Sequence, residues 1–498
     1  MQISTPSSVA IALLWVFGQF SVTEAYPAAA AAVADVCSQL ASIATGSTIT
    51  AADSTEYDRL RKLHWSETAW KVPSCIFEPS DSTALADAVK IISSNNITFA
   101  VRSGGHSPFS NWANVDGGVL VSLSAINAIS YNPTDETVRV GTGNQWAQVY
   151  GKLAEYDRVV VGGRVPDVGF GLLTGGGLSH HSSLYGFAAD NVIIYEVVLS
   201  NGTEKTVSRT SDPEHFWALK AGGTNFGIIS YVTLKAFPQG KVWGGVIFYS
   251  IEYLDQIMAA IAEYQAVGQL DPRSAILPYV AFNNFNSIFI SFSYLDAVER
   301  PEVFNNFYRI PSLLDDTKIH NNFSASISEV VDKVYPRWTW GSTTFYLDNS
   351  TYVQVARLCQ NISRTDEFQA IQGATLVLVP QPVSRAMVQR SVASGEHPMN
   401  LRDREQIWFS INLGWQYASD DARMEQFVVD TLSSIEKLTK SKGLFDEYVF
   451  FNNAHTTQDP LRRYGQNAFR KMKRISRTVD PAQIYQSRLA GGFKLGGS

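Results

Sequence analysis

The sequence feature that most constrains this chain is a glycine turn that directly follows a short apolar run. The apolar run spans 97–101, and residues 102–107 then read Arg-Ser-Gly-Gly-His-Ser. Glycines let main-chain N–H groups approach a ligand without interference from Cβ atoms, and consecutive amides in such a turn form an anion-binding concavity. His106 adds a nucleophilic imidazole at the rim. The turn alone is also typical of a tight hairpin with a packed histidine, but its neighbours favour a phosphate-bearing ligand with a reactive ring.

Three further glycine segments follow in a characteristic order. A strand-like segment at 138–143 contains two glycines, a glycine-dense run occupies 168–178, and residues 222–227 read Gly-Gly-Thr-Asn-Phe-Gly. The run at 168–178 approximates a dinucleotide-binding fingerprint, with Asp190 near the place of a ribose-binding acid. We set that Rossmann interpretation aside, because three adjacent glycines would weaken the helix that must begin there.

The order of these motifs resembles the FAD-binding domain of the vanillyl-alcohol oxidase and p-cresol methylhydroxylase (PCMH) superfamily, and within it the berberine-bridge-enzyme-like oxidases. The resemblance covers residues 70–240 and returns near the C-terminus at 452–454 and 491–494. It implies an α+β fold in which a PCMH-type FAD-binding domain of two subdomains carries an inserted substrate domain, made of an antiparallel sheet and helices.

The resemblance divides the chain into five expected parts. These are a signal peptide at 1–25, a helical N-terminal cap at 26–70, the FAD-binding domain at 71–240, the substrate domain at 241–445 and a C-terminal return to the FAD-binding domain at 446–498. A length of 498 residues exceeds one ordinary core, and a composition of 45% hydrophobic and 17% charged residues suits a large buried interior.

Side-chain patterns predict the content of the substrate domain. Apolar residues alternate at 242–251, 288–294 and 408–417, which predicts antiparallel strands. Residues 254–265 have the periodicity of an amphipathic helix. Most tryptophans of this domain are expected in the core, and some are candidates to line an apolar pocket for a flat ligand: Trp338, Trp340, Trp408 and Trp415.

Several features predict passage through the secretory pathway, or secretion. The apolar stretch at 9–20 is too short to span a bilayer and precedes small residues, as in a secretory signal. In the oxidases that the chain resembles, a disulfide ties the N-terminal helix to the flavin domain, and Cys37 and Cys75 fall at those places. Cys359 is then expected to be a buried apolar residue. Five Asn-x-Ser/Thr sequons are candidate glycosylation sites: Asn96, Asn201, Asn322, Asn349 and Asn361.

Charge and hydropathy exclude two classes of partner. The net charge is −6, and Lys and Arg are scattered rather than clustered, which disfavours nucleic-acid binding. Nothing after the N-terminal stretch is long and apolar enough to span a membrane. The expected partners are therefore a small-molecule substrate and O2.

The resemblance implies that FAD is the cofactor and that His106 bonds covalently to its 8α-methyl group. The alternative for His106 is a noncovalent packing role. Many relatives carry a second attachment through a cysteine, but Val165 stands at that position, so a single histidyl bond is predicted. Val168 corresponds to a position that faces the flavin in the family. The predicted cofactor-binding residues are Arg102, Ser103, Gly104, Gly105, His106, Ser107, Val168, Gly169, Gly175, Gly176, Gly177, Asn225, Gly227 and Ile228.

The catalytic base remains unassigned by the sequence. Sugar-oxidising relatives place a tyrosine base in an Asn-Tyr pair, but this chain has Asn452-Asn453, and an amide accepts no proton near neutral pH. Weak candidates for the base are Tyr417, His455, His180 and His181. Adjacent histidines on one strand would point to opposite faces, and no third ligand is evident, so no metal site is expected.

The function that the sequence favours is an FAD-linked oxidoreductase acting on a small organic molecule, with O2 as electron acceptor. The resemblance suggests a secondary metabolite, such as a polyketide or alkaloid intermediate. Two alternatives stay open. One is a carbohydrate or alcohol oxidase, against which Asn453 argues. The other is a flavin-containing cyclase or binding scaffold that performs no net redox chemistry.

Overall fold

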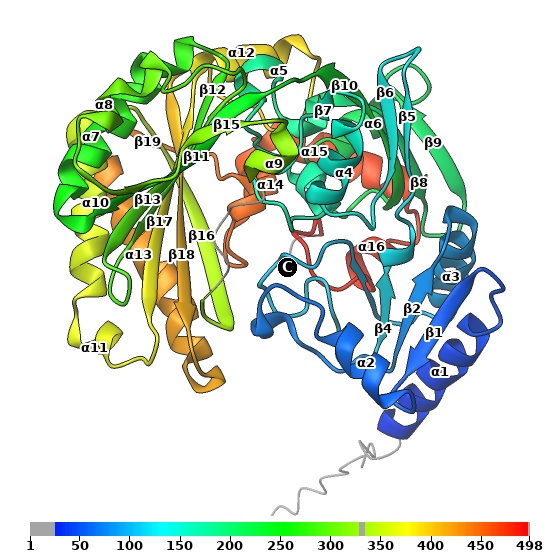
Figure 1. Cartoon of the computed structure of the whole chain (residues 1–498). Helices are drawn as coiled ribbons and strands as arrows, with labels where there is room; N and C mark the ends of the chain where they lie inside the picture. Colours follow the sequence, from blue (N-terminus) through cyan, green and yellow to red (C-terminus); the bar gives the residue numbers. More distant parts are fainter. Residues whose placement is uncertain (1–24, 328–333, 497–498) are drawn as a thin grey trace, which may run out of the picture.

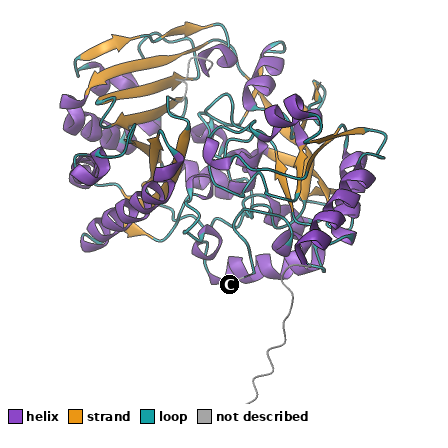
Figure 2. Ribbon diagram, turned by 90° about the horizontal axis from the view of Figure 1, so that it is seen from below, coloured by secondary structure: helices purple, strands orange, loops and turns teal. Residues whose placement is uncertain are grey.

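The structure is a computed structural model that describes residues 25–327 and 334–496 (Figure 1). The predicted signal peptide lies outside the described residues, except for Ala25, where helix α1 (Ala25–Leu40) begins. Two parts lie side by side: two sheets with their helices on the right of Figure 1, and one large sheet with its helices on the left. Figure 2 shows that loops occupy the middle of the molecule, between the sheets.

The first sheet has four strands and is mostly parallel. Its order is β1-β2-β4-β3, in which β2, β4 and β3 run parallel and β1 is antiparallel to β2. A disulfide between Cys37 and Cys75 joins α1 to β2, which confirms the predicted pairing. The predicted cap thus contains two helices but also β1, which we did not predict. The bounds are β1 Gly46–Thr50, β2 Cys75–Pro79, β3 Phe99–Arg102, β4 Val119–Ser122, α2 Ser54–Arg61 and α3 Ser82–Ser94.

The second sheet is antiparallel, with the order β5-β6-β10-β8-β9 and β7 paired to β10. Helix α6 begins where the Asp212 side chain accepts a hydrogen bond from the His215 amide and Pro213 occupies the first turn. The bounds are β5 Ile129–Asn132, β6 Thr137–Gly141, β7 Arg158–Val160, β8 Val192–Val198, β9 Glu204–Ser208, β10 Ile228–Pro238, α4 Trp146–Ala154, α5 Ser182–Tyr185, α6 Pro213–Leu219 and α15 Gln466–Val479.

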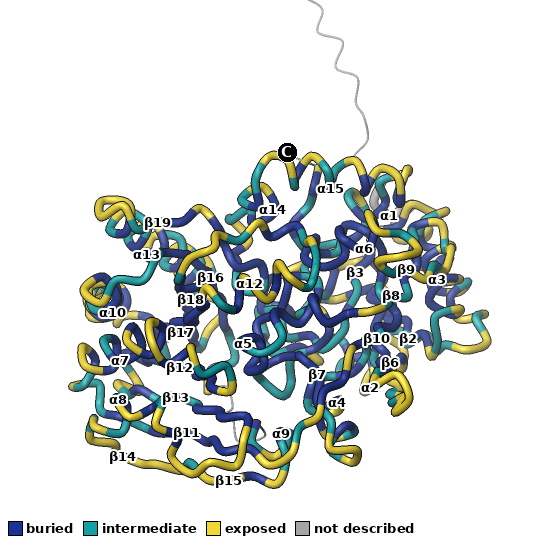
Figure 3. The backbone as a smooth tube through the Cα atoms, turned by 90° about the horizontal axis from the view of Figure 1, so that it is seen from above, coloured by how far each residue is buried: buried dark blue, intermediate teal, exposed yellow. Residues whose placement is uncertain are grey.

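The third sheet is antiparallel, has nine strands and contains all three strands predicted from alternation. Its order is β14-β11-β13-β12-β17-β18-β16-β19, with β15 paired to β11. The predicted amphipathic helix is α7. Figure 3 shows the β14 and β15 edge exposed and the middle of the molecule buried. The bounds are β11 Val242–Ser250, β12 Ser274–Ala281, β13 Ser287–Tyr294, β14 Ser312–Asp315, β15 Lys318–His320, β16 Arg337–Tyr346, β17 Thr375–Val383, β18 Gln406–Trp415, β19 Phe445–Asp446, α7 Leu254–Ala266, α8 Asn305–Tyr308, α9 Phe323–Ile327, α10 Asn349–Ser363, α11 Asp366–Gln369, α12 Arg385–Ala393 and α13 Asp421–Ser441.

The two faces of the third sheet have different tasks, because successive side chains of a strand point to opposite sides. On β17, Leu376 and Leu378 pack into the core formed with the helices α7, α10 and α13. The intervening Val377 and Val379 belong to a separate cluster that includes Trp65, a residue of the other part of the molecule. One face therefore makes the core, and the other is directed at the part of the molecule that holds the first two sheets.

The C-terminal tail returns to the first sheet. The amide of Phe99 donates to the Arg488 carbonyl at 3.0 Å, and the amide of Ala490 donates to the Phe99 carbonyl at 2.7 Å. The tail includes α14 (Pro460–Arg463) and α16 (Ile484–Ser487). It therefore lies beside β3, the strand that leads into the glycine turn.

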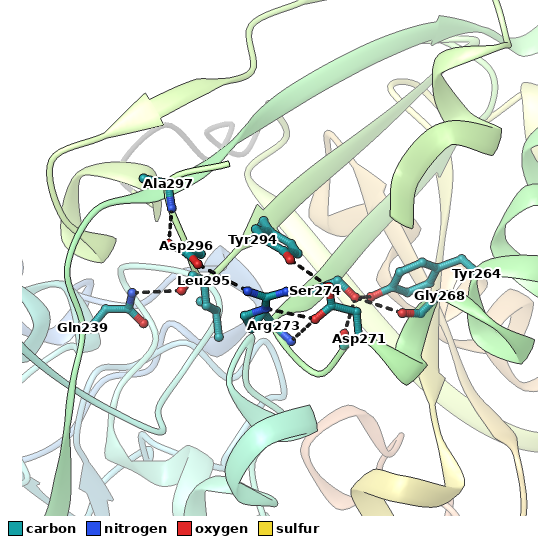
Figure 4. Close-up of polar contacts among 10 residues, drawn as sticks. All are labelled: Gln239, Tyr264, Gly268, Asp271, Arg273, Ser274, Tyr294, Leu295, Asp296 and Ala297. Atoms are coloured by element: carbon teal, nitrogen blue, oxygen red, sulfur yellow. Dashed lines mark hydrogen bonds and ion pairs between the residues drawn. The ribbon is translucent and has the colours of Figure 1, made fainter. Parts of the chain in front are cut away.

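A polar joint connects the two parts where β10 leads into β11 (Figure 4). The Gln239 amide nitrogen donates to the Leu295 carbonyl at 3.5 Å, while its oxygen lies 3.2 Å from Nε2 of His181. Close by, Arg273 contacts both Asp271 and Asp296. Gln239 thus ties the end of β13 to the turn that begins α5, while Arg273 joins the loop before β12 to the loop after β13.

Candidate active site

A cavity of about 730 Å³ lies between the open face of the third sheet and the loops of the other part. The loops on one wall follow β3 and β7. Side chains from one face of five strands, β12, β13, β16, β17 and β18, form the opposite wall, as the two-residue period of a strand requires. The residues of the third sheet on the lining are Leu277, Tyr279, Ala281, Phe289, Trp338, Trp340, Val377, Val379, Gln381, Ser410 and Asn412.

Two glycines bring the two loops of the first wall into backbone contact. A Cβ atom built on Gly104 would lie 2.7 Å from both the Cα and the amide nitrogen of Gly169, so neither position has room for a side chain. Ser103 joins the same loops, because its hydroxyl donates to the Thr142 carbonyl at 2.6 Å and accepts from the Phe170 amide at 3.0 Å. The two loops of the wall that carries His106 are thus joined through backbone at Gly104 and Gly169.

His106 lies on the cavity lining with its ring held between aromatic side chains. Its imidazole stacks on Trp65, with ring centroids 4.8 Å apart and planes inclined by 17°. Trp340, on the opposite wall, lies 6.1 Å away by the same measure. The Nε2 atom is 3.5 Å from an oxygen of Asp167. The ring is therefore oriented by both walls of the cavity.

The predicted cofactor-binding residues divide into two sets. Nine line the cavity: Ser103, Gly104, Gly105, His106, Ser107, Val168, Gly169, Gly227 and Ile228. The other five lie behind it: Arg102, Gly175, Gly176, Gly177 and Asn225.

The second set supports the wall through buried contacts. The Arg102 guanidinium donates to the Leu60 carbonyl and to Ser122 Oγ. A Cβ on Gly175 would meet the Asn452 side chain at 2.5 Å, and Asn452 in turn accepts from the Gly177 amide at 3.1 Å. The motif identifies the loops at the site but does not show which of their residues face the cavity.

None of the four candidate bases is on the cavity lining. Tyr417 is half exposed at the surface. His455 lies with Nε2 2.5 Å from a Glu425 oxygen. Burial, followed by the charge of Arg164, lowers the pKa of His180 to about 3, and burial lowers the pKa of His181 to about 4. Both are neutral near pH 7, and the placement of this pair on a strand is wrong, because they form the turn that begins α5.

Sequence reasoning missed the principal polar group of the cavity, which joins the two walls. Arg164 donates to the side-chain oxygen of Gln381, and the nitrogen of Gln381 donates to Asn453 at 3.2 Å and to the Trp408 carbonyl at 3.3 Å. Of the four tryptophans that were candidates to line a pocket, two line the cavity, Trp338 and Trp340. The other two are buried in the cores.

The residues present fit a flavin dinucleotide. The wall at Gly104 and Gly169 leaves no space for a Cβ, and the buried Thr224 hydroxyl on the lining has no hydrogen-bond partner among the described residues. Loop 103–107 and segment 165–169 would hold the group, with His106 beside it. Among the described residues, no group of three or more His, Cys, Asp and Glu side chains could hold a metal ion.

This arrangement is that of the flavin-binding oxidoreductases: a mostly parallel sheet and an antiparallel sheet share such a cavity with a third, larger sheet. Residues 73–208 match the family model described as an FAD binding domain. The chain is 40% identical over 439 residues to a bifunctional solanapyrone synthase from Alternaria solani, covering 88% of this chain and 85% of that protein. It is 31% identical over 457 residues to an FAD-dependent monooxygenase from Arthrobotrys oligospora, with coverage of 90% and 87%.

Solved structures show the same fold at low identity. The 6-hydroxy-D-nicotine oxidase of Arthrobacter nicotinovorans superposes with a TM-score of 0.73 at 19% identity, covering 89% of this chain and 97% of that one. Glucooligosaccharide oxidase from Acremonium strictum, which carries a 6-S-cysteinyl, 8α-N1-histidyl FAD, gives 0.72 at 15% identity, covering 93% and 100%. The chain belongs to the family of FAD-dependent oxidoreductases that the Alternaria and Arthrobotrys relatives represent, and it shares its fold with a berberine-bridge-enzyme-like protein of Physcomitrella patens (TM-score 0.71, 15% identity). No helix within 25–327 or 334–496 has the length and apolarity to cross a bilayer.

Proposed function

We propose that this protein is an FAD-dependent oxidase of a small organic molecule, an intermediate of secondary metabolism such as a polyketide or alkaloid, with O2 as electron acceptor. FAD, bonded to His106 alone, supplies the hydride acceptor, while the protein contributes positioning and electrostatics. The observation that carries the proposal is the cavity, in which His106 and Val165 lie on one wall and an aromatic and aliphatic face lies on the other. The names of the sequence relatives, a synthase and an FAD-dependent monooxygenase, support the coarser part of the proposal, an FAD-dependent enzyme.

The polar groups of the cavity favour this substrate class over sugars. Asn453 replaces the tyrosine base of sugar-oxidising relatives, and its side-chain oxygen already accepts a hydrogen bond from Gln381. Leu277, Val377 and Val379 make the sheet wall apolar. A flat, largely apolar molecule would bury its surface against these side chains.

We further propose that the protein matures in the secretory pathway. Disulfides such as Cys37–Cys75 persist in oxidising compartments. Four sequon asparagines are exposed, and Asn322 is half-buried. The proposed glycosylation sites are Asn96, Asn201, Asn322, Asn349 and Asn361.

The test is anaerobic mixing of the purified yellow protein with a panel of aromatic alcohols, polyketide intermediates, alkaloids and oligosaccharides. We expect the flavin absorbance to bleach with a compound of the first three groups, and readmitted O2 to restore it with formation of H2O2. Bleaching by oligosaccharides alone would contradict the proposal.

A second candidate is a non-redox step guided by the same cavity, favoured by the word bifunctional in the name of the Alternaria relative. Product formation with the flavin oxidised throughout and no O2 uptake would assign that role instead.

A further inference from the structure

Arg164 is a cation on the cavity lining that has no carboxylate partner among the described residues. Its guanidinium makes one hydrogen bond to a side chain, the bond to Gln381. Asp167, a carboxylate on the same lining, lies beside His106 instead. A guanidinium has five N–H donors in a planar fork, and charges inside proteins are normally paired.

The groups around Arg164 are neutral, so none of them compensates its charge. Burial, followed by the charge of Arg164, lowers the pKa of His180 to about 3, and burial raises the pKa of Tyr279 to about 12. Burial lowers the pKa of Arg164 itself to about 10, which leaves it charged at neutral pH. The cavity therefore holds a positive charge opposite a wall whose side chains are uncharged.

Gln381 is fixed in a way that directs Arg164. Its nitrogen is occupied by Asn453 and the Trp408 carbonyl, so its oxygen is the atom that faces Arg164. Arg164 belongs to the same loop as Val165 and Val168, on one wall of the cavity, whereas Gln381 belongs to β17, on the opposite wall. The guanidinium is thus held at one nitrogen by Gln381, and Arg164 is a lining residue of the cavity.

We propose that Arg164, oriented by Gln381, binds a planar pair of negatively charged oxygens on the substrate, either a carboxylate or the enolate of a 1,3-dicarbonyl. Bidentate recognition of such a pair is the geometry that a guanidinium fork matches. The inference rests on the proposed function, and it narrows the substrate to an acidic molecule whose apolar body lies along Leu277, Val377 and Val379.

The experiment uses two acidic probes with neutral counterparts: 1-naphthoate against 1-naphthamide, and 4-hydroxycoumarin against coumarin. Binding is followed by quenching of tryptophan fluorescence, because Trp65, Trp338 and Trp340 line the cavity. This readout does not require flavin turnover. The first pair of probes tests a carboxylate, and the second tests an enolate.

We expect the acids to bind more tightly than their neutral counterparts. Arg164→Gln should weaken the binding of at least one acid by about tenfold or more, as the loss of hydrogen bonds to a charged group does. The neutral probes should be unaffected. Arg164→Lys keeps the charge but loses the planar fork, so its affinity for the acids should lie between those of the wild type and Arg164→Gln. Arg385→Gln is the matched control, because Arg385 is exposed and pairs with Asp403.

Two outcomes would overturn the proposal. One is that both Arg164 variants lose affinity for the acidic and the neutral probes to the same extent, which would show that Arg164 holds the two walls together and does not bind the acid. The other is an unchanged preference for the acids combined with an altered spectrum of the unliganded flavin, which would place the guanidinium against the cofactor. Failure of the proposed function gives a different result from failure of this inference. The wild-type protein would then be colourless, or no substrate would bleach its flavin.

Discussion

At the scale of single residues, the site depends on two positions where a side chain is absent. Gly104 and Gly169 touch through their backbones, and this contact sets the spacing between the loop of His106 and the segment of Val168. Gly171, two residues further on, meets nothing within 4 Å of the place its Cβ would occupy. Of these glycines, Gly104 and Gly169 therefore allow a close backbone contact, whereas Gly171 has room for a side chain.

This difference predicts the outcome of a matched pair of substitutions. Gly104→Ala should separate the loops, cost about 1–3 kcal/mol of unfolding free energy as overpacking does, and reduce the flavin content of the purified protein. Gly171→Ala should change the unfolding free energy by less than about 0.5 kcal/mol. Urea denaturation and the ratio of flavin to protein absorbance measure both. Equal behaviour of the two variants would contradict the role given to the contact.

At the scale of elements, the disulfide ties the N-terminal helix to the first sheet. It joins Cys37 of α1 to Cys75 of β2 across a sequence separation of 38 residues. The closure of a loop of this length restricts the unfolded chain and so favours the folded one. The helix packs against α3, at the edge of the molecule.

Replacing both cysteines by serine should lower the free energy of unfolding by about 4 kcal/mol, following the loop-length relation. Cys359→Ala is the control, because it removes the buried thiol of α10 and keeps the bridge. Guanidinium denaturation compares the three proteins. A double variant as stable as the wild type would show that the bridge adds nothing to the packing of α1.

How far the elements could be predicted depended on how their faces are buried. The strand at 287–294 begins with a regular alternation of half-buried and buried residues, and the sequence predicted it. In β17 every residue is buried, and its run Thr-Leu-Val-Leu-Val has no polar face. Without that contrast, nothing in the sequence placed Gln381 on the cavity, and the contact with Arg164 went unnoticed. The glycine motifs located the cavity wall but did not separate lining residues such as Gly169 from supporting ones such as Gly175.

At the scale of the whole molecule, three buried histidines couple stability to pH. Burial is the main cause that lowers the pKa of His64 and His180 to about 3 and that of His181 to about 4. In the unfolded chain each returns toward 6.5. Between these values the unfolded chain binds more protons than the folded one, so folding stability is full above pH 6.5 and is lost as the pH falls toward 3.

The free energy of unfolding from urea titrations should therefore decrease from pH 7.5 to pH 4.5, with a slope of up to about 1.4 kcal/mol per pH unit for each histidine, and the urea midpoint should decrease with it. His181→Gln should make the decrease shallower, because the substitution removes one titrating group. A midpoint that stays constant over this range would contradict the placement of these rings in the interior.

The most direct test of the central claim is the mass of one tryptic peptide. Cleavage after Arg102 and Arg139 releases residues 103–139, which contain His106, while Val165 falls in the separate peptide 165–205. We predict that peptide 103–139 carries the added mass of FAD and that peptide 165–205 does not. If peptide 103–139 has its unmodified mass and acid releases all of the yellow colour into solution, His106 does not hold the flavin and the account is contradicted.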